Sequence, residues 1–303
     1  MTNGPENEWH EYYQAFAYFE ADNIRDGNQP STLLHEGGSD KAVILVHGLT
    51  DSPHFVRAIG KHFHYQLGYD VYIPLLQGHG LKIPGKMEGV TLAEWKKNVA
   101  FAIAAAASKS SKVSAGGLST GGALCYLFGL TDPRVTGPLY LFSAALGLFD
   151  LGATPLGRVQ EWLLATPLAR LLDPKRPLVG KNPYRYNYVP LTSATELVYL
   201  IREIRQLHKA GPVASKKKKV FSAWTRSDRV ISWKVLKKHA ETAPGCKVQS
   251  FAIPQRRRVA HASILLKDPI YPTGLTNIVR PLERANPLFG EMLQAVTDFE
   301  NTS

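Results

Sequence analysis

The sequence predicts an α/β protein with a mostly parallel central sheet flanked by helices. Over most of the 303 residues, short apolar runs containing β-branched residues alternate with longer segments of helical period. This alternation is typical of strands joined by right-handed helical crossovers. Several runs are apolar at consecutive positions, as in Lys41–Val46. Consecutive apolar positions indicate strands that are buried on both faces, as in a parallel sheet.

The expected elements follow in chain order. Strands are expected at 41–46, 69–74, 112–116, 138–144, 220–224 and 248–253. Helices are expected at 8–20, 91–107, 123–130, 156–172, 195–209 and 287–299. The first helix is expected because aromatic residues recur there at roughly helical spacing. The helix at 123–130 follows the 112–116 strand through a glycine-rich turn.

One segment interrupts the rhythm of strands and helices. Residues 147–215 carry two helical stretches around a middle rich in Pro and Tyr. An insertion between late strands is expected to form a helical cap or lid over a pocket. The core then comprises residues 40–146 and 216–303, and residues 1–39 form a flank that packs on it. The apolar residues of the cap predict an acyl pocket or, equally, a helix-packing core: Trp162, Leu163, Leu164, Leu168, Leu171 and Leu172.

Composition excludes several classes of protein. A chain that is 44% hydrophobic and 20% charged is not a disordered one. No apolar run approaches the roughly 18–20 residues that a membrane span requires. The polar N-terminus lacks the features of a signal peptide, so we expect a cytoplasmic protein. Cys125 and Cys246 are expected to be free thiols, and neither has metal-ligand spacing.

The charge is unevenly distributed. Residues 1–150 carry 11 basic and 14 acidic side chains, a net charge of −3, whereas residues 151–303 carry 25 and 11, a net charge of +14. The densest basic spots, Lys216–Lys219 and Arg256–Arg258, are not interleaved with aromatic residues. No nucleic-acid-binding motif accompanies them, so we expect no nucleic-acid partner. We favour a solvated basic face, and weak contact with an anionic membrane surface is the alternative.

The strongest chemical signal is the pentapeptide Gly117-Leu118-Ser119-Thr120-Gly121. It follows an expected strand and opens an expected helix. A serine on such a sharp turn projects its hydroxyl above the sheet edge, and small neighbours are needed because backbone and helix crowd there. Ser119 is therefore the candidate nucleophile.

A serine nucleophile needs a general base and a group that holds the base in one tautomer. Asp228 follows the 220–224 strand, and His261 follows the 248–253 strand, in the order expected for this kind of site. His239 also follows Asp228 but falls in a basic helical stretch. Asp268 is the reserve acid.

Negative charge on the substrate oxygen also requires hydrogen-bond donors. The backbone N–H of Thr120, just after the nucleophile, is one candidate. The loop after the first central strand, His47–Pro53, should supply the second through the N–H of Leu49. We expect the His47 side chain to support the turn rather than to act as an acid or base.

Together these motifs resemble the α/β-hydrolase superfamily, and within it the bacterial carboxylesterase and monoacylglycerol-lipase branch. The resemblance rests on Val46–Thr50, Tyr69–Val71 leading into Gly78–Gly80, Gly117–Gly121, Ser227–Val230 and His261. It implies Ser119 as nucleophile, His261 as base and then acid, and Asp228 as the residue that orients His261. It also implies an oxyanion hole formed by the Leu49 and Thr120 N–H groups. In the Gln77–Gly80 loop, a tight turn is favoured over a catalytic role for His79.

The function implied by the resemblance is hydrolysis of a small-molecule carboxylic ester with an apolar acyl group, without metal or cofactor. Monoacylglycerol or lysophospholipid lipase, thioesterase and amidase activities use the same residues and remain alternatives. A non-catalytic binding protein on the same scaffold is a remoter one. The chain departs from the family pattern just before His261, where Arg256–Arg258 replace the usual small residues. These arginines could rim the pocket, but we favour solvent exposure.

Overall fold

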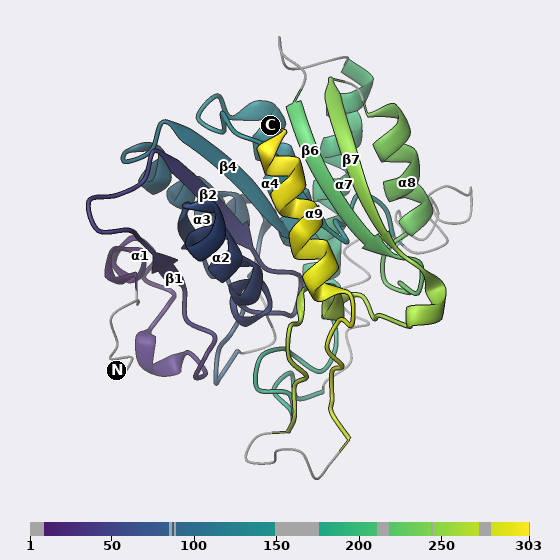
Figure 1. Ribbon diagram of the computed structural model, residues 1–303. Coiled ribbons are helices and arrows are strands. Elements are labelled where there is room, and N and C mark those ends of the chain that lie inside the picture. Colours follow the sequence, from purple (N-terminus) through teal and green to yellow (C-terminus); the bar gives the residue numbers. More distant parts are fainter. Residues whose placement is uncertain are drawn as a thin grey trace.

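The computed structural model describes residues 9–84, 87, 89–148, 176–210, 218–243, 245–272 and 280–302, and the structural statements below concern these residues. Their centre is a seven-stranded sheet with the order β1-β3-β2-β4-β5-β6-β7 (Figure 1). Only β1 is antiparallel to its neighbour, and the other pairs are parallel. The expected fold class is thereby confirmed. The strands are β1 Ser31–Leu33, β2 Lys41–Val46, β3 Asp70–Ile73, β4 Lys112–Leu118, β5 Leu139–Phe142, β6 Lys218–Thr225 and β7 Cys246–Ile253.

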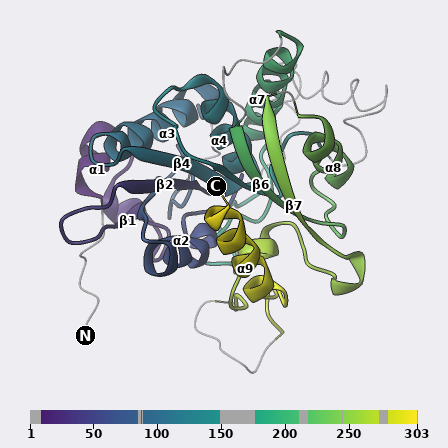
Figure 2. The same ribbon diagram turned by 45° about the horizontal axis from the view of Figure 1, so that its top comes forward.

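Helices cover both faces of the sheet. They are α1 His10–Ala15, α2 His54–Leu67, α3 Leu92–Ala107, α4 Thr120–Thr131, α7 Leu191–Ala210, α8 Trp233–Thr242 and α9 Phe289–Asn301. Three short 3₁₀ turns lie at Ala21–Asn23 (η1), Gln255–Arg257 (η2) and Ala262–Leu265 (η3). Figure 2 shows α2 and α9 on one side of the sheet and α3 and α4 on the other.

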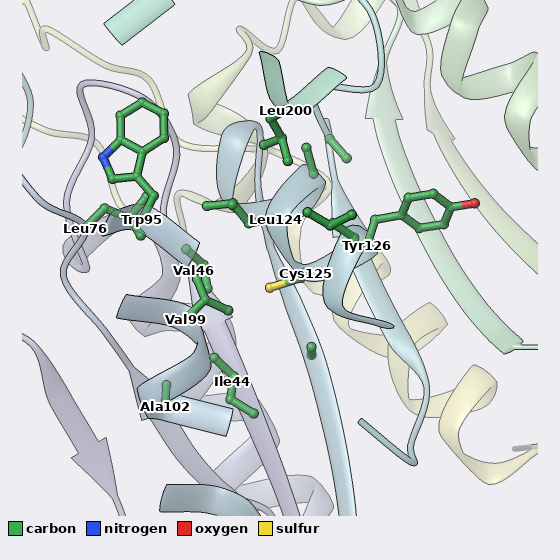
Figure 3. Packing of buried hydrophobic residues seen from close by; sticks show 14 of the residues in the cluster. Ile44, Val46, Leu76, Trp95, Val99, Ala102, Leu124, Cys125, Tyr126 and Leu200 are labelled. Carbon is green, nitrogen blue, oxygen red and sulfur yellow. The ribbon is translucent and has the colours of Figure 1, made fainter. Parts of the chain in front are cut away.

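Two buried clusters hold these layers together. One joins the sheet to α3, α4, α7 and α8, and the other joins it to α2 and α9. Figure 3 shows Ile44 of β2, Val99 of α3, Leu124 of α4 and Leu200 of α7 in the first cluster, all of them fully buried. Truncating one such side chain to alanine typically costs about 2–5 kcal/mol of stability. These two clusters therefore stabilise the sheet and helices that position the site described below.

Helix α7 falls within the expected cap insertion, yet its apolar face packs on core helices. Leu200 and Ile201 lie in the same cluster as Leu124, and α7 contacts both α3 and α4. It thereby serves as part of the crossover between β5 and β6. The helix expected at 156–172, with its cap leucines, lies outside the described residues. No helix among the described residues is both long and apolar enough to cross a membrane.

The N-terminal helix is shorter than its aromatic spacing suggests. Helix α1 covers only His10–Ala15, and a 3₁₀ turn follows at Ala21–Asn23. The expected helix over 8–20 was therefore wrong in length. Four of its aromatic residues are nonetheless buried: Trp9, Tyr12, Phe16 and Phe19. The ring centroids of Trp9 and Tyr12 lie within 5.5 Å of that of Phe101 in α3. The aromatic spacing thus indicated that this segment packs on the core. The chain achieves this packing with the short helix α1 and the loop that follows it.

Candidate active site

The turn between β4 and α4 places Ser119 at the carboxyl edge of the sheet. Ser119 has φ 54° and ψ −116°, outside the regions that ordinary residues favour. Such backbone strain costs about 1–3 kcal/mol and occurs where a side chain must be held in one position. The backbone fixes the turn: the Ser119 N–H donates to Phe142 O at 3.0 Å, and Ser119 O accepts from the Ala145 N–H at 2.9 Å.

The glycines flanking Ser119 are required by close packing. A Cβ on Gly117 or Gly121 would overlap the carbonyl oxygen of Val46 at the end of β2. The absence of side chains therefore brings the β4–α4 turn against β2 and the loop that follows it. This close approach explains why the G-x-S-x-G pattern has glycine at both ends.

His261 and Asp228 lie on loops that follow β7 and β6, as expected. His261 Nδ1 is 2.6 Å from Asp228 Oδ2. The other carboxylate oxygen, Asp228 Oδ1, accepts the N–H groups of Val230 at 2.8 Å and Ile231 at 3.0 Å. Asp228 is thus fixed on both sides and is 2% exposed. Asp268, the reserve acid, is exposed and does not take this place.

The contact with Asp228 determines which nitrogen of the His261 ring carries the proton. When Nδ1 carries the proton and donates it to the carboxylate, Nε2 keeps a lone pair. His261 Nε2 is buried and has no hydrogen-bond partner among the described residues. A buried, oriented imidazole with an accepting nitrogen is the arrangement that a general base needs.

The loop after β2 lies directly against Ser119. A Cβ on Gly48 would lie 3.1 Å from the Ser119 Cβ. Leu49, buried at 8% exposure, and Thr50, with φ 67°, continue this turn. On the other side of Ser119, Thr120 is the first residue of α4, so its N–H has no partner within the helix. Both segments that could supply oxyanion donors therefore flank Ser119.

His47 supports this loop, as the sequence predicted. Its Nδ1 donates to Gly48 O at 2.9 Å, and its Nε2 accepts the Leu76 N–H at 3.1 Å. Burial lowers the pKa of His47 well below its usual value, and the neighbouring His79 lowers it further. The ring is therefore neutral at physiological pH, and both of its nitrogens are occupied by the backbone.

His79 occupies a tight turn. Its neighbours Gly78 and Gly80 have φ values of 80° and 69°, and its Nδ1 donates to Gln77 O at 3.0 Å. Burial lowers the pKa of His79 to about 4, so the ring is neutral. The Tyr186 hydroxyl connects this turn to the described part of the expected cap, since it donates to Gly78 O at 2.9 Å and accepts the Leu81 N–H at 3.0 Å.

Sequence reasoning missed a buried ionic network beside the site. Arg185 Nε lies 3.3 Å from Asp51 Oδ1, and Arg185 Nη1 lies 2.7 Å from Glu283 Oε1. A Cβ on Gly48, the glycine that faces Ser119, would overlap the Asp51 carboxylate, and His261 lies near enough to influence the pKa of Asp51. Burial raises the pKa of Asp51, whereas the positive charge of Arg185 lowers it.

This network connects three segments of the site. Asp51 belongs to the loop after β2, Arg185 to the segment before α7, and Glu283 to the loop after the catalytic-histidine candidate. The N–H of Tyr186 adds a bond to Thr50 O at 2.9 Å in the same place. In the sequence, Asp51 is only an acidic residue in a loop that contains a glycine. Nothing in that pattern indicates Arg185 or Glu283, which are themselves more than 90 residues apart.

The basic residues near the site face water. Arg256–Arg258 lie on η2 and its end, and all three are exposed, as we favoured. A cavity of about 1360 Å³ lies between α2, α9 and the 265–272 loop, and its lining contains none of Ser119, Asp228 and His261. Since none of the candidate reactive groups lines this cavity, we locate the active site by its chemical groups and not by cavity size.

Comparison with known proteins identifies a family for this chain. The chain matches the serine aminopeptidase S33 family over residues 37–238. It is 34% identical to a carboxylesterase of Bacillus subtilis (strain 168) over 105 residues, which are 34% of this chain and 42% of that protein. It is 32% identical to a thermostable monoacylglycerol lipase of Bacillus sp. (strain H-257) over 122 residues, 40% of this chain and 48% of that protein. Each alignment thus spans less than half of the relative.

Solved structures show the same fold over nearly the whole chain. A structure reported with the metagenome-derived lipolytic enzymes LipS and LipT has a TM-score of 0.66 at 18% identity, covering 92% of this chain and 100% of that one. A soluble variant of monoglyceride lipase from Saccharomyces cerevisiae, with a substrate analogue, has a TM-score of 0.59 at 14% identity, covering 89% and 91%. At such identities the likeness concerns the fold. The match over two thirds of the sequence, with this fold, shows that the chain belongs to the serine aminopeptidase S33 family of α/β-hydrolases.

Proposed function

We propose that the protein hydrolyses small-molecule carboxylic esters through an acyl-enzyme, with Ser119 as nucleophile. The observation that carries this proposal is the contact between His261 Nδ1 and Asp228 Oδ2, at 2.6 Å. It lies at the same edge of the sheet as the strained turn that holds Ser119. The buried Nε2 of His261 supplies the acceptor that a serine hydroxyl requires.

The reaction follows from these groups. Ser119 Oγ attacks the ester carbonyl while His261 Nε2 takes its proton, and Asp228 stabilises the resulting imidazolium. The N–H groups of Leu49 and Thr120 stabilise the negative charge on the carbonyl oxygen, and loss of one such donor typically slows the reaction about 10²–10³-fold. His261 then protonates the leaving alcohol. Water, activated by the same histidine, attacks the acyl-enzyme and releases the acid.

Esters are favoured over amides and thioesters by the relatives. Two curated relatives are a carboxylesterase and a monoacylglycerol lipase, and each alignment spans less than half of the relative. The acyl group, its chain length and the alcohol of the ester substrate are therefore left to the experiment below. No metal or cofactor enters the mechanism.

The test is hydrolysis of p-nitrophenyl esters with acyl chains of two to sixteen carbons. Ser119→Ala should abolish turnover, and Ser114→Ala, a buried serine at the other end of β4, should retain it. A maximum at short chains assigns a carboxylesterase, and a maximum at ten carbons or more assigns a lipase. Retained turnover in Ser119→Ala, or cleavage of matched amides or thioesters but not esters, would contradict the proposal.

A monoacylglycerol or lysophospholipid lipase is the second candidate, because Arg256–Arg258 project into solvent on the loop that leads to His261. Three exposed cations near the sheet edge would attract an anionic lipid surface. Hydrolysis of monoacylglycerol in vesicles should then rise when anionic lipid is added, and Arg256→Glu with Arg257→Glu should remove that rise. Equal rates on neutral and anionic vesicles would leave the arginines with no role in lipid contact.

A further inference from the structure

A second cluster of reactive side chains lies at the other edge of the sheet. It contains His35 in the loop between β1 and β2, His64 in the last turn of α2, and Asp70, the first residue of β3. Strands β3, β2 and β4 are parallel, so Asp70 marks the amino edge and Ser119 the carboxyl edge. The cluster is therefore separate from the candidate active site.

The spacing of the three side chains suits a metal ion. Each offers one ligand atom, and these atoms lie within 4.8 Å of one another. His35 Nδ1 is 3.0 Å from Asp70 Oδ1. In a tetrahedral zinc site with bonds of about 2.0–2.1 Å, neighbouring ligand atoms are about 3.3 Å apart. The His35–Asp70 pair already has nearly this separation, and the ligand atom of His64 lies within 4.8 Å of both.

Backbone contacts hold the Asp70 carboxylate in place. Asp70 Oδ1 accepts the His35 N–H at 2.8 Å, and Oδ2 accepts the Ser39 N–H at 3.1 Å. The residue is 1% exposed. Bonds of this kind, outside the ligand set, fix the orientation of ligating carboxylates in metal sites.

A further contact fixes the ring of His64. Its Nδ1 lies 3.1 Å from Tyr69 O, and a carbonyl can only accept, so Nδ1 carries the proton and Nε2 keeps the lone pair. Ligating histidines commonly donate their second nitrogen to a backbone carbonyl in this way. The ring centroids of His64 and His35 are 4.0 Å apart, so the two imidazoles contact each other.

We propose that His35, His64 and Asp70 bind a divalent transition-metal ion of the Zn²⁺ type, with water completing the coordination. Two imidazoles and one carboxylate favour Zn²⁺, Ni²⁺ or Cu²⁺ over Mg²⁺ and Ca²⁺, which prefer all-oxygen sites. The metal takes the position of the proton between His35 Nδ1 and Asp70 Oδ1, and the neutral His35 ring then carries its proton on Nε2. The bound ion ties the 34–39 loop to α2 and β3.

The test uses the full chain, freed of any affinity tag and treated with a chelator. Calorimetric titration with Zn²⁺ should show one site per chain, and the thermal midpoint should rise with Zn²⁺ but not with Mg²⁺. His35→Gln and His64→Gln should each weaken binding by at least about tenfold. His62→Gln, which alters a histidine two residues away on the same helix, should bind like the parent.

Three further measurements separate this site from folding and catalysis. Circular dichroism without metal should show that the His35 and His64 variants are folded, and Co²⁺ should give visible absorption in the parent and the His62 variant only. Ser119→Ala should bind Zn²⁺ with unchanged affinity, so the result does not depend on the proposed function. Equal Zn²⁺ affinity in the parent, His35→Gln and His64→Gln would overturn the proposal.

Discussion

Replacing Arg185 by methionine should destabilise the protein and disturb the loop that faces Ser119. Methionine keeps much of the length of the side chain but removes the cation that lies 3.3 Å from Asp51 and 2.7 Å from Glu283. Both carboxylates are largely buried, at 2% and 14% side-chain exposure. Breaking a fully buried ion pair costs about 3–5 kcal/mol. Because the Arg185 side chain is 27% exposed, we expect a smaller loss, about 2 kcal/mol.

The loss should depend on pH. Burial already raises the pKa of Asp51, and removing Arg185 removes a charge that lowers it. In the variant the folded state then holds a proton on Asp51 to higher pH than the unfolded state does. The free energy of unfolding therefore falls as the pH rises through the folded pKa of Asp51. The variant should be close to the parent at pH 4 and furthest below it at pH 8.

Urea unfolding at pH 4, 6 and 8, with ester hydrolysis at pH 8, measures both effects. Arg134→Met is the matched control, because it removes a more exposed pair with Asp132 and should cost less than about 1 kcal/mol. Adding Asp51→Asn to Arg185→Met should recover part of the loss at pH 8. A loss at pH 8 no larger than that of Arg134→Met, or a loss independent of pH, would refute the reasoning.

Two further predictions concern the fold around the site. Gly121→Ala should cost several kcal/mol of stability and abolish hydrolysis, since the new Cβ would overlap the carbonyl oxygens of Val46 and His47. Gly290→Ala is the control, because no atom lies within 4 Å of its new Cβ. Its free energy of unfolding in urea should stay within about 1 kcal/mol of the parent. Burial lowers the pKa of His239 to about 4, so the unfolded state binds the extra proton first as the pH falls below about 6.5. Stability should thus fall between pH 6.5 and 4, by up to about 3 kcal/mol from this residue, and His239→Phe should flatten that fall; an unchanged slope would exclude His239 as a source.

The sheet was largely predictable because parallel strands buried on both faces form apolar runs. β2, β4 and β6 could therefore be located from the sequence within a few residues. β1 was missed because Ser31–Leu33 is a three-residue antiparallel edge strand without such a run. Helix α2 was also missed, although Phe55, Val56, Ile59 and Phe63 follow a helical period that ends at Gly68 with φ 70°.

The candidate catalytic residues could be proposed from the sequence because each lies in the turn or loop that follows a predicted strand. The networks around them were not. Asp51, Arg185 and Glu283 come from three distant segments, and so do the bonds of Tyr186 to the Gly78 turn. His35, His64 and Asp70 have no motif spacing either, because a loop, a helix end and a strand start bring them together. Such contacts depend on tertiary packing rather than on local periodicity.

The central claim is that Ser119 is a nucleophile activated by His261. Labelling with a serine-directed fluorophosphonate, followed by peptide mass spectrometry, tests it most directly. We predict one modified residue, Ser119, with labelling slowed by at least about 10³-fold in His261→Ala. Labelling of a different serine, or labelling of Ser119 at the same rate in His261→Ala, would contradict the account.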